Sequence, residues 1–179
     1  MRVIGIDPGS VICGYGVVDM IGNSFTLVEY GVVKAKLQSE DFNGRLKILN
    51  ESVDRIIKRT SPDISAFETI FYAKNVQSLV KLSHARASTI LSASQNNIPV
   101  FEYSPNEIKK SVTGKGKASK EQVQFMVKKL LNITETPEYL DSTDALAIAI
   151  CHCLKLGNSN KKSTSNWSQF AKENPERVK

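Results

Sequence analysis

Residues 1–18 read MRVIGIDPGSVICGYGVV, and the rest of the chain can be placed around them. Residues 3–6 form a short apolar run without helical periodicity, and the Asp-Pro-Gly-Ser turn bounds it. Such a run is typical of a strand that is buried on both faces of a sheet. Asp7 is therefore expected at the carboxyl end of a central strand, where open α/β sheets place their chemistry. A simple turn residue is the alternative, because Asp-Pro is common in turns.

A second apolar run begins at Gly14 and Gly16, which flank Tyr15. We expect the two glycines in a hairpin, with room for another backbone to approach closely. Residues 25–33 predict a third strand after a turn over 21–23. The opening of the chain is thus predicted to be a meander of three strands.

The apolar spacing then predicts strands and helices in alternation. In order, they are a helix over 41–60, a strand over 63–68, a helix over 73–96, a strand over 98–101, and helices over 105–112, 119–131 and 140–156. The helix over 73–96 has Val76, Leu79, Val80, Leu82, Ala87, Ile90 and Leu91 as its apolar side. Ser119 and Gln122 match a capping box. The pattern predicts a single α/β domain over residues 1–156, with a mixed sheet.

The charge of the chain is unevenly distributed. The 179 residues carry a formal net charge of +6, and residues 104–120 hold five lysines against one acid. Such a cluster indicates a polyanionic partner, most simply nucleic acid, although a solvated lysine-rich face is the alternative. No apolar run reaches transmembrane length and the N-terminus does not resemble a signal peptide, so a cytoplasmic location without membrane contact is expected.

The composition changes at Gly157 to Asn, Ser, Thr and Lys. This predicts a flexible basic tail over residues 157–179. The three cysteines have no framework spacing and fit a reducing compartment. The triplet Cys151-His152-Cys153 suggests a metal site, but two cysteines two residues apart do not share a helix face, so ordinary core residues are expected.

Four acids occupy positions that favour chemistry. Asp7 and Glu68 each end a predicted strand, and Asp141 and Asp144 are three apart at the start of the last helix, so they share one face. If the two strands are neighbours, the four carboxylates cluster at one sheet edge and need a counter-charge. Oxygen-only ligands favour Mg²⁺ or Mn²⁺, and two such ions about 3.5–4 Å apart would hydrolyse a phosphodiester. Helix capping is the alternative for Asp141 and Asp144.

Several stretches together resemble one known family. They are IGIDPGS at 4–10, GYGV at 14–17, FETIFYAKN at 67–75, PVFEY at 99–103, QVQ at 122–124, MV at 126–127 and DSTDALAIA at 141–149. In order and spacing, over about residues 1–156, they are similar to the bacterial Holliday-junction resolvases of the RuvC family.

The resemblance implies a ribonuclease-H-like fold, a five-stranded mixed sheet flanked by helices. It implies a homodimeric endonuclease that resolves four-way DNA junctions by paired symmetric nicks, in homologous recombination and DNA repair. Mg²⁺ is the implied cofactor, with Mn²⁺ as a substitute and two ions per active site. The implied partner is the RuvA–RuvB branch-migration complex.

The resemblance also assigns roles to individual residues. It implies that Asp7, Glu68, Asp141 and, as a fourth acid, Asp144 are catalytic and bind the metal. Lys109 and Lys120 match lysines that the family uses near the scissile phosphate and the DNA backbone, so they are implied to be catalytic and DNA-binding. Phe71 matches an aromatic that stacks on junction bases, with core packing as its alternative. Lys74, Lys110, Lys115 and Lys117 are further candidate DNA-binding residues, the last three because they belong to the basic cluster over 104–120.

Two other classes fit parts of the pattern. A kinase-like or ATPase relative would also open with an acidic turn that cradles phosphate, but such proteins are usually larger and have two lobes. A non-catalytic DNA-binding module would use the acids only to cap and turn. ATP hydrolysis without DNA would indicate the first class, and absence of Mg²⁺ or Mn²⁺ binding would indicate the second.

Overall fold

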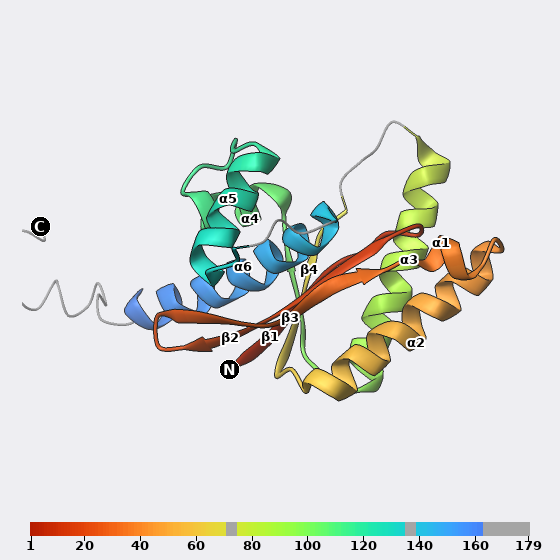
Figure 1. The fold of residues 1–179 in the computed structure, drawn as a ribbon, viewed down its shortest axis with the longest axis horizontal. Coiled ribbons are helices and arrows are strands. Elements are labelled where there is room, and N and C mark those ends of the chain that lie inside the picture. Colours follow the sequence, from red (N-terminus) through yellow and green to blue (C-terminus); the bar gives the residue numbers. More distant parts are fainter. Residues whose placement is uncertain (71–74, 135–138, 163–179) are drawn as a thin grey trace, which may run out of the picture.

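One five-stranded sheet forms the centre of the molecule (Figure 1), in a computed structural model that describes residues 1–70, 75–134 and 139–162. The strand order is β3-β2-β1-β4-β5. The strands are β1 (Arg2–Asp7), β2 (Cys13–Ile21), β3 (Ser24–Val33), β4 (Ile64–Glu68) and β5 (Val100–Tyr103). The predicted mixed sheet of five strands is confirmed.

The strand pairing explains why the sheet is mixed. β1 pairs with β2 and β2 with β3 in antiparallel fashion, which confirms the meander, whereas β1–β4 and β4–β5 are parallel. The sequence predicts the last strand over 98–101, but the structure has it two residues later. The ladder extends past Glu68, because the Thr69 N–H donates to the Tyr103 carbonyl at 2.9 Å and so keeps Tyr103 extended.

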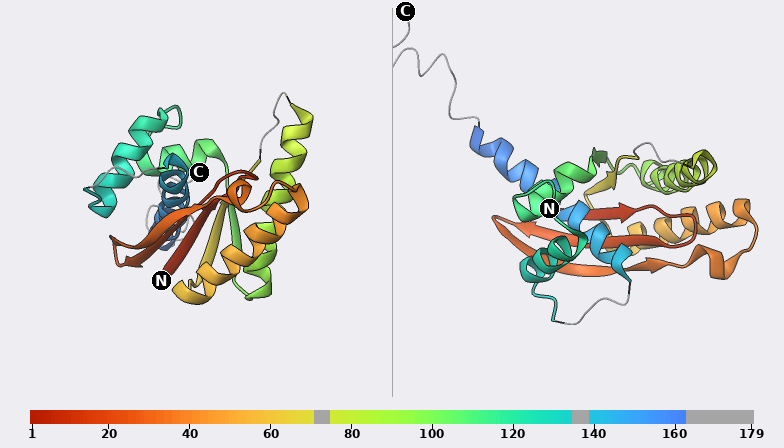
Figure 2. Two further views of the ribbon diagram at one scale, coloured as in Figure 1. Left: turned by 45° about the vertical axis from the view of Figure 1, so that its right-hand side comes forward. Right: turned by 90° about the horizontal axis from the view of Figure 1, so that it is seen from above.

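Helices cover both faces of the sheet (Figure 2). α1 (Ala35–Gln38), α2 (Phe42–Thr60) and α3 (Val76–Gln95) lie on one face, and α4 (Pro105–Thr113), α5 (Lys120–Leu131) and α6 (Leu140–Lys162) lie on the other. The sequence does not predict α1, which is too short to show periodicity. Complete capping boxes begin α4 at Ser104 and α5 at Ser119, so the predicted Ser119–Gln122 box is confirmed.

α3 packs differently from the prediction. Its N-cap is Asn75, and residues 73 and 74 of the predicted helix lie outside the described residues. Much of its apolar side is exposed, with relative exposures of 60% for Val76, 46% for Val80 and 52% for Leu91. Small side chains face α2 instead, and Ser88 and Ser92 donate to backbone carbonyls of that helix, each at 2.7 Å. Such side chains allow close helix packing without a large apolar stripe.

α6 is the most buried helix of its face and crosses β1 and β2. Its residues from Ala145 to Cys153 are essentially inaccessible to solvent. The sequence predicts its end at Leu156, but the helix continues through Lys162 and therefore includes the start of the predicted tail. Residues 163–179 lie outside the described residues. Within the described part of the chain, no helix is both long and apolar enough to span a bilayer.

Candidate active site

Asp7 and Glu68 stand next to each other at the carboxyl ends of two parallel strands. The last residue pair of the β1–β4 ladder joins Ile6 to Phe67, so Asp7 and Glu68 are the next residues along each strand. Side chains alternate along β1: Ile4 and Ile6 belong to the core under α2 and α3, whereas Val3 packs with α6. Asp7 therefore faces α6.

Glycines on β1 and β2 allow α6 to pack directly against the backbone of these two strands. A Cβ atom on Gly5 would lie 2.1 Å from the Ala145 carbonyl oxygen, and one on Gly14 would lie 2.1 Å from the Asp141 carbonyl oxygen. Gly14 is also the residue opposite Asp7 in the β1–β2 register. The first turn of α6 is thereby seated beside Asp7. The close approach predicted at Gly14 is confirmed, and Gly5 contributes in the same way.

The four acids act on one another electrostatically. Burial, followed by the charges of Asp144, Glu68 and Asp141, raises the pKa of Asp7 to about 7 against a smaller opposing effect of Lys120. Burial also raises the pKa of Glu68, with Asp144 as the next cause. The structure thus brings together the acids that the sequence places on two strands and one helix.

Two lysines reach the same place from α4 and α5. The Lys120 ammonium lies 3.1 Å from the Asp144 carboxylate, which raises the pKa of the lysine. Lys109 and Lys120 line a small cavity of about 80 Å³ together with Glu68 and Asp144. Lys120 is the first residue of α5, so the Ser119 capping box that begins this helix also fixes the position of the lysine.

The remaining predicted site residues divide into two groups. Lys110, Lys115 and Lys117 are exposed on α4 and on the loop that follows it, between the two lysines of the cavity. Phe71 and Lys74 lie outside the described residues.

Cys151, His152 and Cys153, for which the sequence predicts ordinary core positions, are fully buried. The His152 ring shares a 2.6 Å hydrogen bond with the Tyr103 hydroxyl.

The donor set suits a hard divalent cation. In the described ranges, no three histidine, cysteine, aspartate or glutamate side chains stand close enough to hold an ion as they lie. Carboxylates without a counter-ion repel one another, and this repulsion adds to burial in raising the pKa of Asp7. A cation bound by oxygen ligands would remove the repulsion, because Lys120 and Lys109 offset only part of the negative charge. Asp7, Glu68, Asp141 and Asp144 are the residues that could hold the ion.

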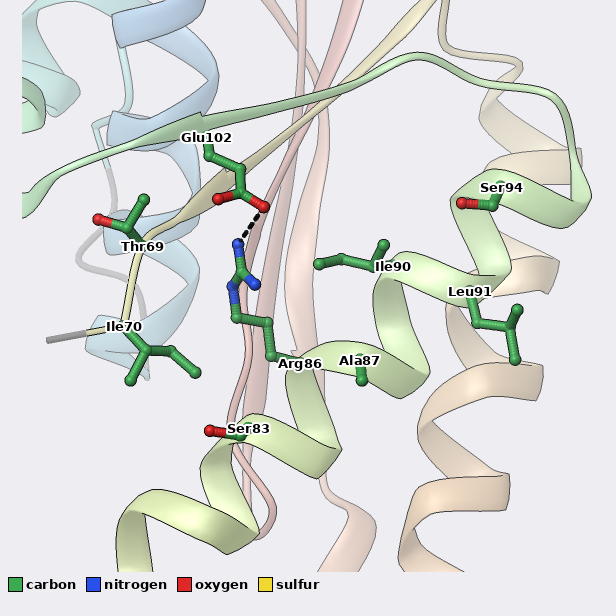
Figure 3. Close-up of a pocket in the computed structure, with 9 residues that line it drawn as sticks. All are labelled: Thr69, Ile70, Ser83, Arg86, Ala87, Ile90, Leu91, Ser94 and Glu102. Carbon is green, nitrogen blue, oxygen red and sulfur yellow. Dashed lines mark ion pairs between the residues drawn. The ribbon is translucent and has the colours of Figure 1, made fainter.

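One further residue at the site escapes prediction from sequence. Arg86 lies in the middle of α3 (Figure 3). Its Nε donates to the Glu68 carbonyl at 3.1 Å. An arginine within a helix has no sequence signal that connects it to a strand end eighteen residues earlier.

The five-stranded mixed sheet with helices on both faces has the fold of the ribonuclease-H-like class. Within that class, the profile of the family described as "Crossover junction endodeoxyribonuclease RuvC" matches residues 3–152. The chain belongs to this family.

Individual relatives agree with the family match. The chain is 42% identical to the RuvC of Cytophaga hutchinsonii over 177 residues, which cover 99% of this chain and 88% of the relative. It is 46% identical to the RuvC of Pseudothermotoga lettingae, with 86% and 94% of the two chains covered.

Solved structures give the same result. Thermus thermophilus RuvC, in complex with its Holliday junction substrate, matches with a TM-score of 0.83 and 31% identity, over 89% of this chain and 96% of that one. The yeast mitochondrial Holliday junction resolvase Ydc2 shares the fold, with a TM-score of 0.68 at 18% identity.

Proposed function

We propose that this protein is a crossover junction endodeoxyribonuclease that resolves Holliday junctions by paired symmetric nicks, in homologous recombination and DNA repair. The observation that carries the proposal is the convergence of Glu68, Asp141 and Asp144 on the buried Asp7, in a chain of the RuvC family. The Thermus relative, similar over nearly its whole length, has a Holliday junction as its substrate.

The four acids are proposed to hold the divalent ions of the reaction. The ions would be Mg²⁺, with Mn²⁺ as a substitute, and two per site would match the number of carboxylates. When bound, they supply counter-charge and Lewis acidity toward the scissile phosphodiester. Asp7 must give up its proton for this, which its pKa of about 7 allows near neutral pH.

Lys109 and Lys120 are proposed to act on the DNA phosphate. Negative charge builds on the phosphate oxygens during attack, and a fixed ammonium at the cavity stabilises that charge. The ion pair with Asp144 holds Lys120 in place before DNA binds. The exposed Lys110, Lys115 and Lys117 extend the positive charge away from the cavity and would contact the DNA backbone. Stacking by Phe71 and a DNA contact by Lys74 follow from the family resemblance alone.

Two symmetric cuts require two active sites related by a two-fold axis, hence an isologous dimer. We place the pairing face on α3, because Val80 and Leu91 leave apolar surface exposed there. A groove of about 570 Å³ runs beside this surface, from Thr69 and Ile70 to Leu91 (Figure 3). It begins directly after Glu68, so a second copy seated on it would connect the two sites.

The RuvA–RuvB complex is the proposed partner in branch migration.

The test uses a labelled synthetic four-way junction and a linear duplex of the same sequence, with Mg²⁺, with Mn²⁺ and with EDTA. Paired nicks at symmetric positions, on the junction only and with metal only, are expected. Binding without cutting under every condition would leave a junction-binding module and contradict the proposal.

A further inference from the structure

Arg86 connects α3 to the backbone of a proposed catalytic acid. Its Nε donates to the Glu68 carbonyl at 3.1 Å, and its guanidinium lies 2.7 Å from the Glu102 carboxylate on β5 (Figure 3). The arginine side chain is only 15% exposed, whereas the Glu102 side chain is 48% exposed. One side chain therefore joins α3, the end of β4 and β5.

The Glu68 carbonyl needs such a partner because the β1–β4 ladder has already ended. Its last residue pair is Ile6 with Phe67, one residue before Glu68. The next group along the chain, the Thr69 N–H, donates to the Tyr103 carbonyl at 2.9 Å. Both polar atoms of the peptide between Glu68 and Thr69 are thus held, the oxygen by α3 and the nitrogen by β5.

A peptide fixed on both sides fixes the backbone that directs the Glu68 side chain. A charged donor makes the stronger kind of hydrogen bond, which suits this task. Glu102, which is 48% exposed, adds little stability as a surface ion pair, but it orients the guanidinium. We propose that Arg86 is a positioning residue: it holds the Glu68 carboxylate toward the metal ligands Asp7 and Asp144. The inference rests on the proposed function of that site.

Three substitutions separate this role from a merely structural one. Arg86→Met removes the donor, and Arg86→Ala also opens space that a guanidinium ion can occupy. Lys81→Met is the matched control, because it removes a cation from the exposed side of the same helix. Each variant is compared with the wild type for melting temperature, oligomeric state and junction binding in EDTA.

Two readouts test the proposal. The first is Mn²⁺ binding by calorimetry without DNA, and the second is single-turnover cutting of a saturating junction. Residues that orient metal ligands typically contribute about 10–100-fold to metal affinity or activity, so Arg86→Met should lower both by about that factor. Lys81→Met should match the wild type. Millimolar guanidinium should restore cutting by Arg86→Ala, and methylammonium should not.

Wild-type Mn²⁺ binding and cutting by Arg86→Met would overturn the proposal. So would a loss that accompanies dissociation or a lower melting temperature and that guanidinium does not restore, because Arg86 would then have a structural role. If the wild type itself does not cut the junction, the proposed function fails. The Mn²⁺ isotherms would still decide whether Arg86 positions Glu68.

Discussion

At the scale of single residues, Asp7 lowers the stability of the metal-free protein whenever its carboxyl group is ionised. The carboxyl group is buried beside three other acids, and its pKa is about 7 in the folded protein against 3.8 ordinarily. The folded state therefore binds a proton that the unfolded state releases. Stability from this group is fully present below pH 3.8 and is lost as the pH rises through about 7.

Asp7→Asn should accordingly stabilise the metal-free protein. At pH 8 in EDTA we expect the free energy of unfolding to rise by up to about 4 kcal/mol, since each pKa unit corresponds to about 1.4 kcal/mol. The gain should shrink as the pH falls from about 7 toward 4. Urea unfolding at several pH values measures it, and equal stability of both proteins at pH 8 would show that Asp7 is not under this strain.

Substitutions of Lys120 and Lys110 should affect different steps, the cutting rate and junction binding respectively. Lys120→Met removes the charge at the cavity, so cutting should slow by about 10²–10³-fold at saturating junction, as when one transition-state donor is removed. Lys110→Met removes an exposed charge on α4 instead. It should weaken junction binding and reduce its salt dependence by about one phosphate contact, with little change in the cutting rate. Equal effects of the two substitutions on the rate would contradict the assignment.

At the scale of elements, the seat of α6 on glycines is what brings acids from three elements together. Gly14→Ala would put a methyl carbon 2.1 Å from the Asp141 carbonyl oxygen, so the start of α6 must move. We expect a loss of about 1–3 kcal/mol or more in stability, as for other overpacked sites. Because Asp141 and Asp144 would move with the helix, cutting should fall by more than stability alone explains.

Gly157→Ala is the control for that substitution. It also lies on α6, but nothing approaches its position within 4 Å. An alanine there should leave cutting unchanged and stabilise the helix by about 0.5–1 kcal/mol. Thermal unfolding and cutting rates of both variants test the idea, and wild-type behaviour of Gly14→Ala would show that Gly14 does not set the position of α6.

In this protein, sequence patterns predict the strands and helices better than the contacts by which they pack together. Short apolar runs, turn residues and capping residues are local, so the meander and the Ser119 box follow from them. The acid cluster is predictable because Asp7 and Glu68 both end strands, once β1 and β4 are neighbours. The packing of α3 through Ser88 and Ser92 is not, because hydroxyls that donate to another helix resemble solvent-exposed serines. Arg86 is missed for a similar reason: its contact joins distant parts of the chain.

At the scale of the whole molecule, α3 is the proposed pairing face, and its apolar surface should control assembly. Leu91→Glu places a charge on a side chain that is 52% exposed, so a folded monomer should result. Ile21→Glu is the matched control, because Ile21 is 74% exposed at the end of β2, away from α3. Sedimentation velocity measures the two masses.

The monomeric form should also change the pattern of cutting. Leu91→Glu is expected to lose paired nicks on one junction, while Ile21→Glu keeps them. A dimeric Leu91→Glu variant would move the pairing face to another surface.

Single-turnover cutting of a labelled four-way junction by wild-type protein and by Asp7→Asn tests the central claim most directly, that the acid cluster around Asp7 is a catalytic centre. Junction binding in EDTA is measured on the same samples. We predict paired, symmetric nicks from the wild type with Mg²⁺, none from Asp7→Asn, and equal binding by both. Near wild-type cutting by Asp7→Asn would contradict the claim.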